Sequence, residues 1–416
     1  MLKAAAAPCR DLKKGPLAGL RVLDLSRILA GPFCTQILAD YGADVIKVEQ
    51  PGLGDDTRHW KTRAEEKIWK STSPMSFYFC SVNRNKRSLT LDLKKEKARK
   101  ILYDLAKSAD VVVENFLPGK ADELGVGYEK LSEINPSLIY ASICGYGSTG
   151  PYAKRAGYDA IAAAEGGLMH ITGEPGRGPV RPGLGMTDMS TGLYTHGAIM
   201  AALRERDQTG RGQKIDASLF ETQVSLLINV GLNWLNAGIE GQRWGAAHPS
   251  IVPYNTFETK DGWLTMGANN ERQFRTLTER INRPDLLEDE RFSSNPKRVE
   301  NRAAMDEVMN AIMREKTTDE WCEILSGSGL AYGSVNSIER VFKHPQIEPR
   351  KMVDTVDSDL IDGGKLKMIG TPVKFSGSEF GTKAPAPSLG QHTSDVLTEL
   401  GYSEDTIASF VDEKVV

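Results

Sequence analysis

Residues 20–49 read LRVLDLSRILAGPFCTQILADYGADVIKVE, and the apolar runs in this stretch set the architecture of the chain. The runs over residues 20–25 and 45–49 predict two buried strands. Between them, residues 32–40 predict an amphipathic helix, which Pro32 can begin because proline suits the first helical position. A strand, a helix and a second strand of this length predict a parallel βαβ unit.

Further segments extend this pattern along the chain. Short, wholly apolar strands such as residues 111–113 are typical of parallel sheets that are buried on both faces. We therefore predict an α/β fold with a doubly wound, Rossmann-like sheet. The turn after the first strand contains Ala30-Gly31-Pro32 instead of a GxGxxG motif, so we expect no dinucleotide cofactor. The other predicted elements are strands at 88–93, 138–143 and 213–217 and helices at 94–108, 220–237 and 393–401.

The composition limits the classes of partner. The 416 residues predict two or three domains. A formal net charge of −3 creates no strong field of either sign, so we expect neither nucleic acid nor an anionic membrane as a partner. The sequence also contains no apolar run of about 18 residues, the length that a transmembrane helix requires.

The five cysteines lie far apart in the sequence and form no CxxC pair. This spacing predicts free thiols in a reducing compartment and no metal site. Residues 1–14 carry Lys3, Arg10, Lys13 and Lys14 beside one acidic residue, a bias that is typical of the end of a mitochondrial presequence. We therefore expect the protein in the mitochondrial matrix, with the cytoplasm as the alternative.

Changes of pattern along the chain predict the domain boundaries. Residues 256–267 predict a β-hairpin, whereas residues 271–329 are highly charged and helical in pattern. A Pro/Gly-rich, extended stretch follows at 372–387. We predict a large domain over 1–215, a small α+β domain over 225–330, and a return segment over 331–416 that completes the large domain.

The stretch from Gly185 to Gly192 places Asp188 among small residues, directly before the apolar residues 193–203. Because no bulky sequence neighbour covers it, a ligand can approach this carboxylate closely. The carboxylate can then act as a covalent nucleophile toward an activated acyl group. The alternative is structural, because an aspartate before an apolar run is often the N-cap of a helix. The residues alone leave both interpretations open.

Motifs of a known family occur in order along nearly the whole chain. They are Leu17–Asp24, Ala30–Pro32, Asp40–Glu49, Asn83–Ser88, Val113–Phe116, Thr209–Gln213 and Leu389–Thr393. With these motifs the chain resembles the family III CoA-transferases, the CaiB–BaiF group. A further set consists of residues 157–160, 167–173, 179–183, 243–245 and 250–254. Through this set the chain is most similar to the members of the group that use succinyl-CoA and glutarate.

The resemblance implies an architecture and a chemistry. It implies a large domain formed by both ends of the chain, a small domain between them, and a homodimer of two interlocked, ring-like subunits. Such interlocking makes the stability of the folded subunit inseparable from that of the dimer. The implied substrates are an acyl-CoA donor, with succinyl-CoA expected, and a free dicarboxylic acid such as glutarate or 3-hydroxy-3-methylglutarate. Coenzyme A is thus a substrate, and no permanently bound cofactor is expected.

The resemblance also assigns residues. In the family one aspartate forms covalent acyl intermediates, and the matching residue is Asp188. Backbone N–H groups of the glycine-rich residues 145–150 are expected to hold the developing oxyanions. Leu29 and Glu123 stand where some members carry glutamine and arginine, and the small domain lacks the glycine run of oxalate-related members, so oxalate and formate are not the expected substrates. The positions that match CoA contacts are Arg27, Leu91, Lys94, Asn115, Phe116, Leu124 and Tyr158.

A dicarboxylate substrate leaves a second carboxylate that needs a cationic or hydrogen-bonding partner, and arginine provides the bidentate form. The candidates are Arg181, Arg243, His248 and Ser250. For each arginine the alternative is a solvated surface ion pair. For His248 the alternative is a packed or surface histidine.

Asp159 supports a second hypothesis. At the matching position, the α-methylacyl-CoA racemases of the same superfamily use an aspartate as acid and base, paired with an earlier histidine. This chain has no histidine between His59 and His170, so the partner that racemisation needs is missing. Asp159 can also orient the substrate of a transferase. A third hypothesis is a non-enzymatic protein that only binds CoA or an acyl-CoA.

Overall fold

The computed structural model describes residues 15–70 and 74–416, so the predicted presequence in residues 1–14 lies outside the described chain. The described residues form two compact units. The large unit contains the chain up to Leu168, Pro182–Leu232 and Glu348–Val416, and the small unit contains Met169–Arg181 and Asn233–Ile347.

The limits of these units differ from the boundaries predicted from the sequence. Residues 169–181 belong to the small unit, where Arg243 Nη1 donates to the carbonyl oxygen of Arg177 at 2.9 Å. Residues 331–334 also belong there, because they form a strand of its sheet. The predicted boundaries followed changes of composition, which carry no information about such contacts between distant segments.

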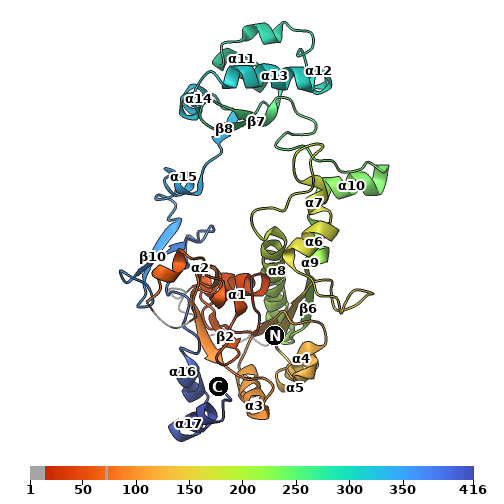
Figure 1. Ribbon diagram of the computed structural model, residues 1–416. Coiled ribbons are helices and arrows are strands. Elements are labelled where there is room, and N and C mark those ends of the chain that lie inside the picture. The colour runs from red at the N-terminus through yellow and green to blue at the C-terminus, as the bar shows by residue number, and fades with distance from the viewer. Residues whose placement is uncertain (1–14, 71–73) are drawn as a thin grey trace, which may run out of the picture. The chain divides into compact units, whose positions relative to one another are not determined.

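Six parallel strands form the centre of the large unit, in the order β3-β2-β1-β4-β5-β6 (Figure 1). This is the strand order of the Rossmann fold, and it confirms the predicted doubly wound α/β sheet. The strands are rich in valine and isoleucine, as expected where helices cover both faces of a sheet. Their bounds are Arg21–Asp24 (β1), Asp44–Glu49 (β2), Lys86–Thr90 (β3), Val111–Glu114 (β4), Ile139–Cys144 (β5) and Lys214–Ser218 (β6).

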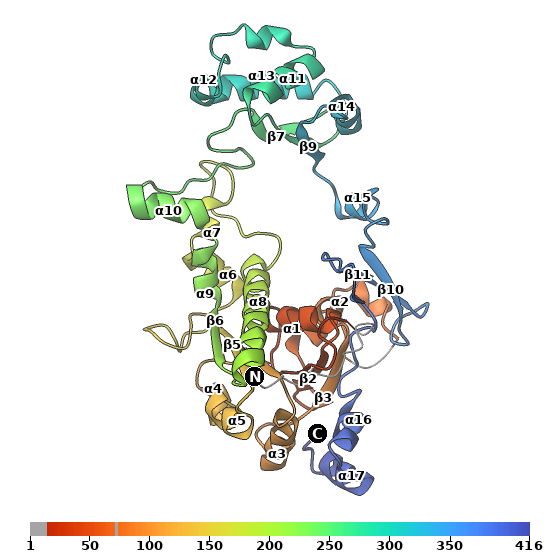
Figure 2. The ribbon, with the colours of Figure 1, turned by 180° about the vertical axis from the view of Figure 1, so that it is seen from behind.

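Helices cover both faces of this sheet, because side chains along each strand alternate between the faces. In β1, Val22 packs into one core with α1 (Ala30–Asp40) and α8 (Met186–Thr209). Leu23 packs into a second core with α3 (Glu96–Ala106) on the other face. α1 and α8 lie against each other in both views of the ribbon (Figures 1 and 2). The sheet is therefore held between helices that pack on each of its two faces.

The C-terminal helices complete the second core. α16 (Thr393–Glu399) and α17 (Glu404–Asp412) lie near α3 in both views, and their apolar side chains join its core (Figures 1 and 2). The N–H of Asp92 donates to the carbonyl oxygen of Val415 at 2.9 Å. Residues from the last part of the chain are thus built into the sheet domain next to β3.

One predicted helix, over residues 220–237, is wrong as a single element. The structure has α9 (Leu219–Ser225) and then α10 (Ile228–Ala237). The backbone turns at Ile228, whose φ of 39° is incompatible with a continuous right-handed helix. No glycine or proline marks this break in the sequence.

The remaining elements of the large unit surround the sheet. Its shorter α-helices are Phe77–Ser81 (α2), Lys120–Glu123 (α4), Tyr128–Ile134 (α5) and Asp159–Glu165 (α6), and Leu168–Ile171 (α7) spans the limit between the units. Two 3-10 helices cover Asp56–His59 (η2) and Glu65–Lys67 (η3). A separate antiparallel pair consists of Val353–Asp357 (β10) and Lys365–Ile369 (β11).

The small unit combines an antiparallel sheet with helices. Its sheet has the order β7-β8-β9, and β7 and β8 form the predicted hairpin. The predicted helical stretch consists of four α-helices and one 3-10 helix that pack on a core of their own. The bounds are Tyr254–Glu258 (β7), Trp263–Gly267 (β8), Glu271–Arg280 (α11), Pro284–Leu287 (η4), Asn295–Glu300 (α12), Arg302–Met313 (α13), Thr318–Leu325 (α14), Ala331–Ser334 (β9) and Ile338–Phe342 (α15). In the part of the chain that the structure describes, no helix has both the length and the apolar character needed to cross a bilayer.

Candidate active site

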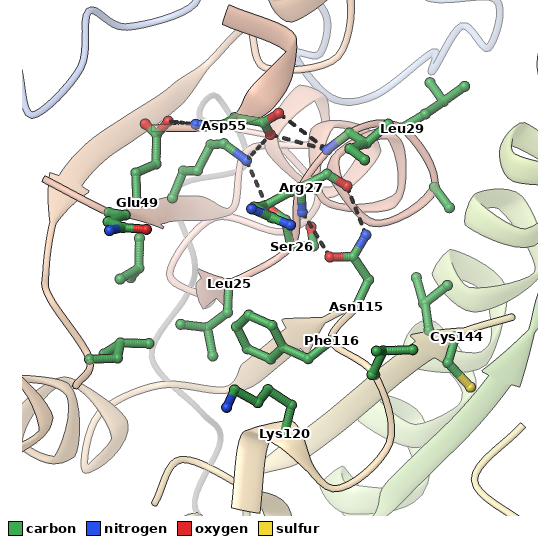
Figure 3. Close-up of a pocket in the computed structure, with 18 of the residues that line it drawn as sticks. Leu25, Ser26, Arg27, Leu29, Glu49, Asp55, Asn115, Phe116, Lys120 and Cys144 are labelled. Carbon is green, nitrogen blue, oxygen red and sulfur yellow. Dashed lines mark hydrogen bonds and ion pairs between the residues drawn. The ribbon is translucent and has the colours of Figure 1, made fainter. Parts of the chain in front are cut away.

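A cavity of about 560 Å³ opens at the carboxyl ends of the parallel strands of the large unit (Figure 3). Residues that follow β1, β2, β4 and β5 line it, together with a residue in the first turn of α8. β2 lies on one side of β1 and β4 on the other, so the strand order reverses at this point. In open α/β sheets, ligands bind in the crevice that such a reversal creates.

Every residue predicted to contact CoA lines this one cavity, and Asp188 lines it too. Lys94 and Arg27 are exposed and supply positive charge, whereas Leu91 is buried and supplies apolar surface. This combination suits a ligand that joins phosphate groups to an apolar stem, as CoA does. The other predicted residues that line the cavity are Asn115, Phe116, Leu124 and Tyr158.

Lys120 lines the same cavity, although no sequence prediction included it (Figure 3). It is the first residue of α4, and its Nζ lies 2.7 Å from Glu123 Oε2. Glu123 occupies the position where some family members carry arginine. Lys120 therefore provides positive charge beside the position where this chain lacks that arginine.

Asp188 lies in the first turn of α8, and it is not the N-cap of this helix. The N-cap is Gly185, which has no side chain to bond the exposed N–H groups of the first turn. The carboxylate of Asp159 bonds them instead, because its Oδ1 accepts the N–H of Thr187 at 2.9 Å and that of Asp188 at 3.2 Å. The N-cap role that was the alternative for Asp188 is therefore wrong, because Asp159 caps this helix.

Asp159 is buried, with 8% of its surface exposed, and it is not among the residues that line the cavity. It begins α6, and its side chain points to the start of α8. An acid or base for racemisation must reach the α-carbon of the bound acyl group. The geometry instead makes Asp159 the anchor of the helix that carries Asp188.

Small residues allow α8 to lie directly on α1. A Cβ atom on Gly192 would stand 2.7 Å from the carbonyl oxygen of Ala30. A Cβ atom on Gly185 would stand 2.8 Å from Cδ2 of Leu29. Both distances are shorter than those that real Cβ atoms show. The backbone of Ala30 cannot move aside, so glycine is required at position 192, whereas at position 185 the end of the Leu29 side chain can shift. The glycine flanks noted in the sequence therefore serve helix packing as well as access to Asp188.

The loop between β1 and α1 forms one wall of the cavity. The N–H of Arg27 donates to Asn115 Oδ1 at 2.8 Å, and Asn115 Nδ2 donates back to the carbonyl oxygen of Arg27 at 2.7 Å (Figure 3). The next residue, Ile28, has a φ of 73°. This left-handed conformation is unusual for a β-branched residue. The pair of bonds with Asn115 joins the ends of β1 and β4 across the reversal of the strand order.

Three buried ion pairs lie beneath this loop. Lys47 Nζ lies 2.9 Å from Asp55 Oδ2, and Lys86 Nζ lies 2.9 Å from Asp24 Oδ2, with no exposed surface on any of the four side chains. The third pair joins Arg58 and Glu49 through two bonds of 2.7 Å. No sequence prediction covered this network. The available signal was the occurrence of lysine and glutamate inside the otherwise apolar strand β2.

The buried charges shift one another's protonation. Burial opposes ionisation of Asp24, but Lys86 and Lys47 outweigh it and hold the pKa of Asp24 well below its ordinary value. Burial lowers the pKa of Lys86 to about 8, even though Asp24 favours its charged form. Burial also opposes the charge of Lys47, yet Asp55 and the neighbouring carboxylates raise its pKa. Asp24, Lys86 and Lys47 are therefore charged at neutral pH.

The glycine-rich residues 145–150 offer fewer free donors than expected. The N–H of Ser148 donates to Asp216 Oδ2 at 3.0 Å, and the N–H groups of Tyr146 and Gly147 bond the sulfur of Cys144. Gly145 itself lines the cavity. The N–H groups of these three residues are thus engaged within the protein, and Gly145 is the residue of this loop that lines the cavity.

The residues predicted to hold the second substrate carboxylate all belong to the small unit. Arg181 ends its first segment. The ring of His248 stacks on Tyr254 with 5.4 Å between centroids, and the N–H of Ser250 donates to His248 Nδ1 at 3.2 Å. These contacts fit a packed histidine in a turn. A role of Arg181, Arg243, His248 and Ser250 in binding the substrate stays a prediction.

Among residues 15–70 and 74–416, no group of three or more histidine, cysteine, aspartate or glutamate side chains is arranged to hold a metal ion.

The model of CoA-transferase family III matches residues 17–393 of this chain. The chain is 51% identical to an acyl-CoA transferase of Fusarium pseudograminearum over 99% of its own length and 91% of that protein. It is 45% identical to the succinyl-CoA:glutarate CoA-transferase of Mus musculus over 98% of its own length and 91% of that protein.

A solved structure gives the same result. The CAIB/BAIF family protein from Brucella suis superposes with a TM-score of 0.84 at 40% identity, covering 93% of this chain and 100% of that one. The chain belongs to the family III CoA-transferases and is an enzyme of that class.

Proposed function

We propose that this enzyme transfers CoA from succinyl-CoA to a dicarboxylic acid such as glutarate or 3-hydroxy-3-methylglutarate, with Asp188 as the covalent nucleophile. The observation that carries the proposal is the position of Asp188 in the same cavity as all seven residues expected to contact CoA. The likeness to the succinyl-CoA:glutarate CoA-transferase of Mus musculus supports the choice of substrates.

The first half of the reaction transfers CoA to the enzyme. An oxygen of Asp188 attacks the thioester carbonyl of succinyl-CoA, the C–S bond breaks, and a mixed anhydride and a CoA thiolate form. The thiolate then attacks Cγ of Asp188, and the bond between Cγ and the bridging oxygen breaks. Succinate leaves with one oxygen of Asp188, and an aspartyl-CoA thioester remains.

The second half repeats these steps in reverse on the acceptor. A carboxylate oxygen of glutarate attacks Cγ of Asp188 and displaces the CoA thiolate, which gives a second anhydride. The thiolate attacks the glutaryl carbonyl and releases Asp188 with one oxygen from glutarate. The energy of the thioester is kept throughout, so no ATP is required.

The structure supports the first attack in two ways. Asp188 lies at the start of a 24-residue helix, where the partial positive charge of the helix stabilises an anion. Its backbone is held by Asp159 and by the close contact of α8 with α1. A nucleophile that is fixed in this way needs little reorganisation before it attacks.

The direct test is incubation with succinyl-CoA and glutarate, followed by measurement of glutaryl-CoA. Enzyme quenched during turnover should carry the mass of one CoA on the peptide that contains Asp188. Glutarate labelled with ¹⁸O in its carboxylates should leave label in the same aspartate after turnover. Product formation without label or adduct on this peptide would remove Asp188 from its role.

The acceptor class is tested through the small unit. We propose that Arg243 binds the second carboxylate of the acceptor, because arginine suits that group best. Arg243→Ala should raise the KM for glutarate at least about tenfold, as loss of a charge-assisted hydrogen bond does, and should leave the KM for a monocarboxylic acceptor unchanged. An equal change for both acceptors would contradict this assignment.

The racemase hypothesis makes a separate prediction. Exchange of the α-proton of a branched acyl-CoA with solvent deuterium should not exceed the rate without enzyme, because Asp159 lies buried at the start of α8. Enzyme-dependent exchange that Asp159→Asn abolishes would support racemisation.

Assembly and location complete the proposal. We expect an interlocked homodimer, a state supported by the exposed side chains of Leu232 (59%), Trp234 (55%) and Leu235 (78%) on α10. The dimer should persist on dilution in light-scattering measurements. The matrix location rests on residues 1–14 and is tested by fusing them to a fluorescent reporter.

A further inference from the structure

The loop from Ser26 to Leu29 carries an unfavourable backbone conformation at the wall of the cavity. Ile28 has a φ of 73°, in the left-handed region that favours glycine. Its neighbours Arg27 and Leu29 line the cavity on either side of it. Such a conformation persists only where surrounding groups fix it.

Two buried charges bond the backbone of this loop (Figure 3). The N–H of Ile28 lies 3.2 Å from both carboxylate oxygens of Asp55. Lys47 Nζ lies 2.9 Å from Asp55 Oδ2 and donates to the carbonyl oxygen of Ser26 at 2.8 Å. The pair thus contacts the backbone on both sides of Arg27, which is itself bonded to Asn115.

The pair is held in turn by the rest of the network. The N–H of Asp55 donates to Glu49 Oε2 at 3.0 Å, and Thr57 donates to Asp55 Oδ1 through its N–H at 3.0 Å and its hydroxyl at 2.7 Å. Asp55 and Lys47 are among the residues that line the cavity, but their side chains have no exposed surface, so they act on a ligand through the loop backbone that they bond. Charged acceptors form shorter and stronger bonds than neutral ones, which suits an N–H in an unfavourable conformation.

We propose that Asp55 and Lys47 are positioning residues for CoA binding. Through the N–H of Ile28 and the carbonyl of Ser26, they select the one loop conformation in which Arg27 and Leu29 line the cavity. This inference rests on the proposed binding of CoA in that cavity. Without the pair, the loop occupies other conformations as well. The apparent affinity for CoA then falls in proportion to the fraction of molecules that still have the binding conformation.

The test uses a double substitution that avoids an unpaired buried charge. Asp55→Asn with Lys47→Met removes both charges while keeping the side-chain volumes close. The dissociation constant for CoA and the KM for succinyl-CoA should rise about 10- to 100-fold, whereas kcat should change less than about threefold. Calorimetry with CoA and steady-state kinetics measure the two quantities.

A third substitution separates positioning from general damage. Ile28→Gly, added to the double variant, permits the same φ without strain, so CoA affinity should recover at least about tenfold. The melting temperature should not recover with it, because the charge pair is still missing. An affinity that recovers only together with the melting temperature would overturn the inference.

The matched control is the ion pair of Asp40 and Arg84, at the opposite end of α1. It is also buried, with Arg84 Nη2 2.6 Å from Asp40 Oδ2, and it does not line the cavity. Asp40→Asn with Arg84→Met should lower the melting temperature and leave CoA affinity unchanged. Loss of CoA affinity in this control equal to that in the Asp55 variant would contradict a specific role of the Asp55–Lys47 pair.

A final pair of variants separates this inference from the proposed function. Phe116→Ala and Lys94→Ala change the cavity wall itself, and each should weaken CoA binding. If neither does, the cavity is not the CoA site and the proposed function fails. If both do and the Asp55/Lys47 variant binds CoA like the wild type, only the positioning role is wrong.

Discussion

The two segments that meet at the cavity, the β1–α1 loop and the start of α8, are fixed by opposite means. Three buried ion pairs lie against the loop, and one of them, Asp55 with Lys47, bonds the backbone at Ile28, which has a conformation that suits glycine. The start of α8 is fixed differently: it contains glycines, and they let α8 lie directly on α1. The difference shows that one wall of the cavity is fixed by charge, while the proposed nucleophile, Asp188, is fixed by close backbone packing and one distant carboxylate.

The largest expected effect is the loss of activity when Asp188, the proposed nucleophile, is replaced. Asp188→Ala should lower kcat at least about 10⁴-fold, as removal of a covalent nucleophile does, while CoA affinity and the melting temperature stay near wild type. Single-turnover assays with succinyl-CoA measure this loss. Turnover within about tenfold of wild type would show that α8 contributes packing alone.

Removing a charge from the network should have the next largest effect, on stability. Asp24→Asn leaves Lys86 without its charged partner and should lower the free energy of unfolding by about 3–5 kcal/mol. Urea unfolding at neutral pH measures this change. A loss below about 1 kcal/mol would show that this buried pair contributes no more to stability than an exposed ion pair does.

The same variant gives a pH test. The pKa of Asp24 is lowered in the folded protein, so its contribution to stability is complete above the unfolded pKa of about 4. The contribution is lost as the pH falls from there toward the folded pKa. The wild type should therefore lose more stability than Asp24→Asn between about pH 5 and pH 3. Parallel slopes in the two proteins would contradict the shift.

A change in packing should have a smaller effect. Gly192→Val would place Cβ 2.7 Å from the carbonyl oxygen of Ala30, and it should cost about 1–3 kcal/mol of stability by separating α8 from α1. Gly197 lies in the same helix, and apart from its chain neighbours and the nearby backbone of α8 no atom lies within 4 Å of the place that its Cβ would take, so Gly197→Ala should be neutral or slightly stabilising. Equal losses in both variants would show that helix propensity, and not contact with α1, requires the glycine.

The smallest expected effect is at the anchor of α8. Asp159→Asn keeps the shape of the side chain and removes its charge, so the cap should weaken by about 1 kcal/mol. We expect kcat to fall about tenfold while the KM for succinyl-CoA stays within about twofold. A pure loss of stability without a change in kcat would limit Asp159 to folding.

The sequence predicted those parts of the molecule that are determined by residues close together in the chain. The strands β1, β2, β4 and β5 follow from short apolar runs, and the hairpin of the small unit follows from its turn residues. β3 lies at Lys86–Thr90 and overlaps the alternating stretch predicted at 88–93 only in part. The resemblance placed Asp188 and seven further residues, and the structure brings all eight to one cavity. This worked because seven of these eight residues follow a strand or lie near the start of a helix at the same edge of the sheet, whereas Leu124 follows the short helix α4.

The parts that the sequence did not predict depend on contacts between distant segments. Asp159 caps a helix that begins 27 positions later, as Asp159 and Met186 show, and no local pattern pairs these residues. No sequence prediction included Asp55 or Lys47, because their burial depends on segments that only the fold brings together around them. The division of the predicted helix at Ile228 also lacks a sequence signal, because neither glycine nor proline occurs there.

The bond between Asp92 and Val415 has a consequence for biosynthesis. The core behind β3 contains Val396, Leu397 and Phe410, so a ribosome must deliver almost the entire polypeptide before that core can close. Until then the nascent chain exposes one apolar side of its sheet, the kind of surface that chaperones recognise. An early stop codon that removes only α17 would thus leave an incompletely folded chain that proteases can degrade, even though Asp188 is still present.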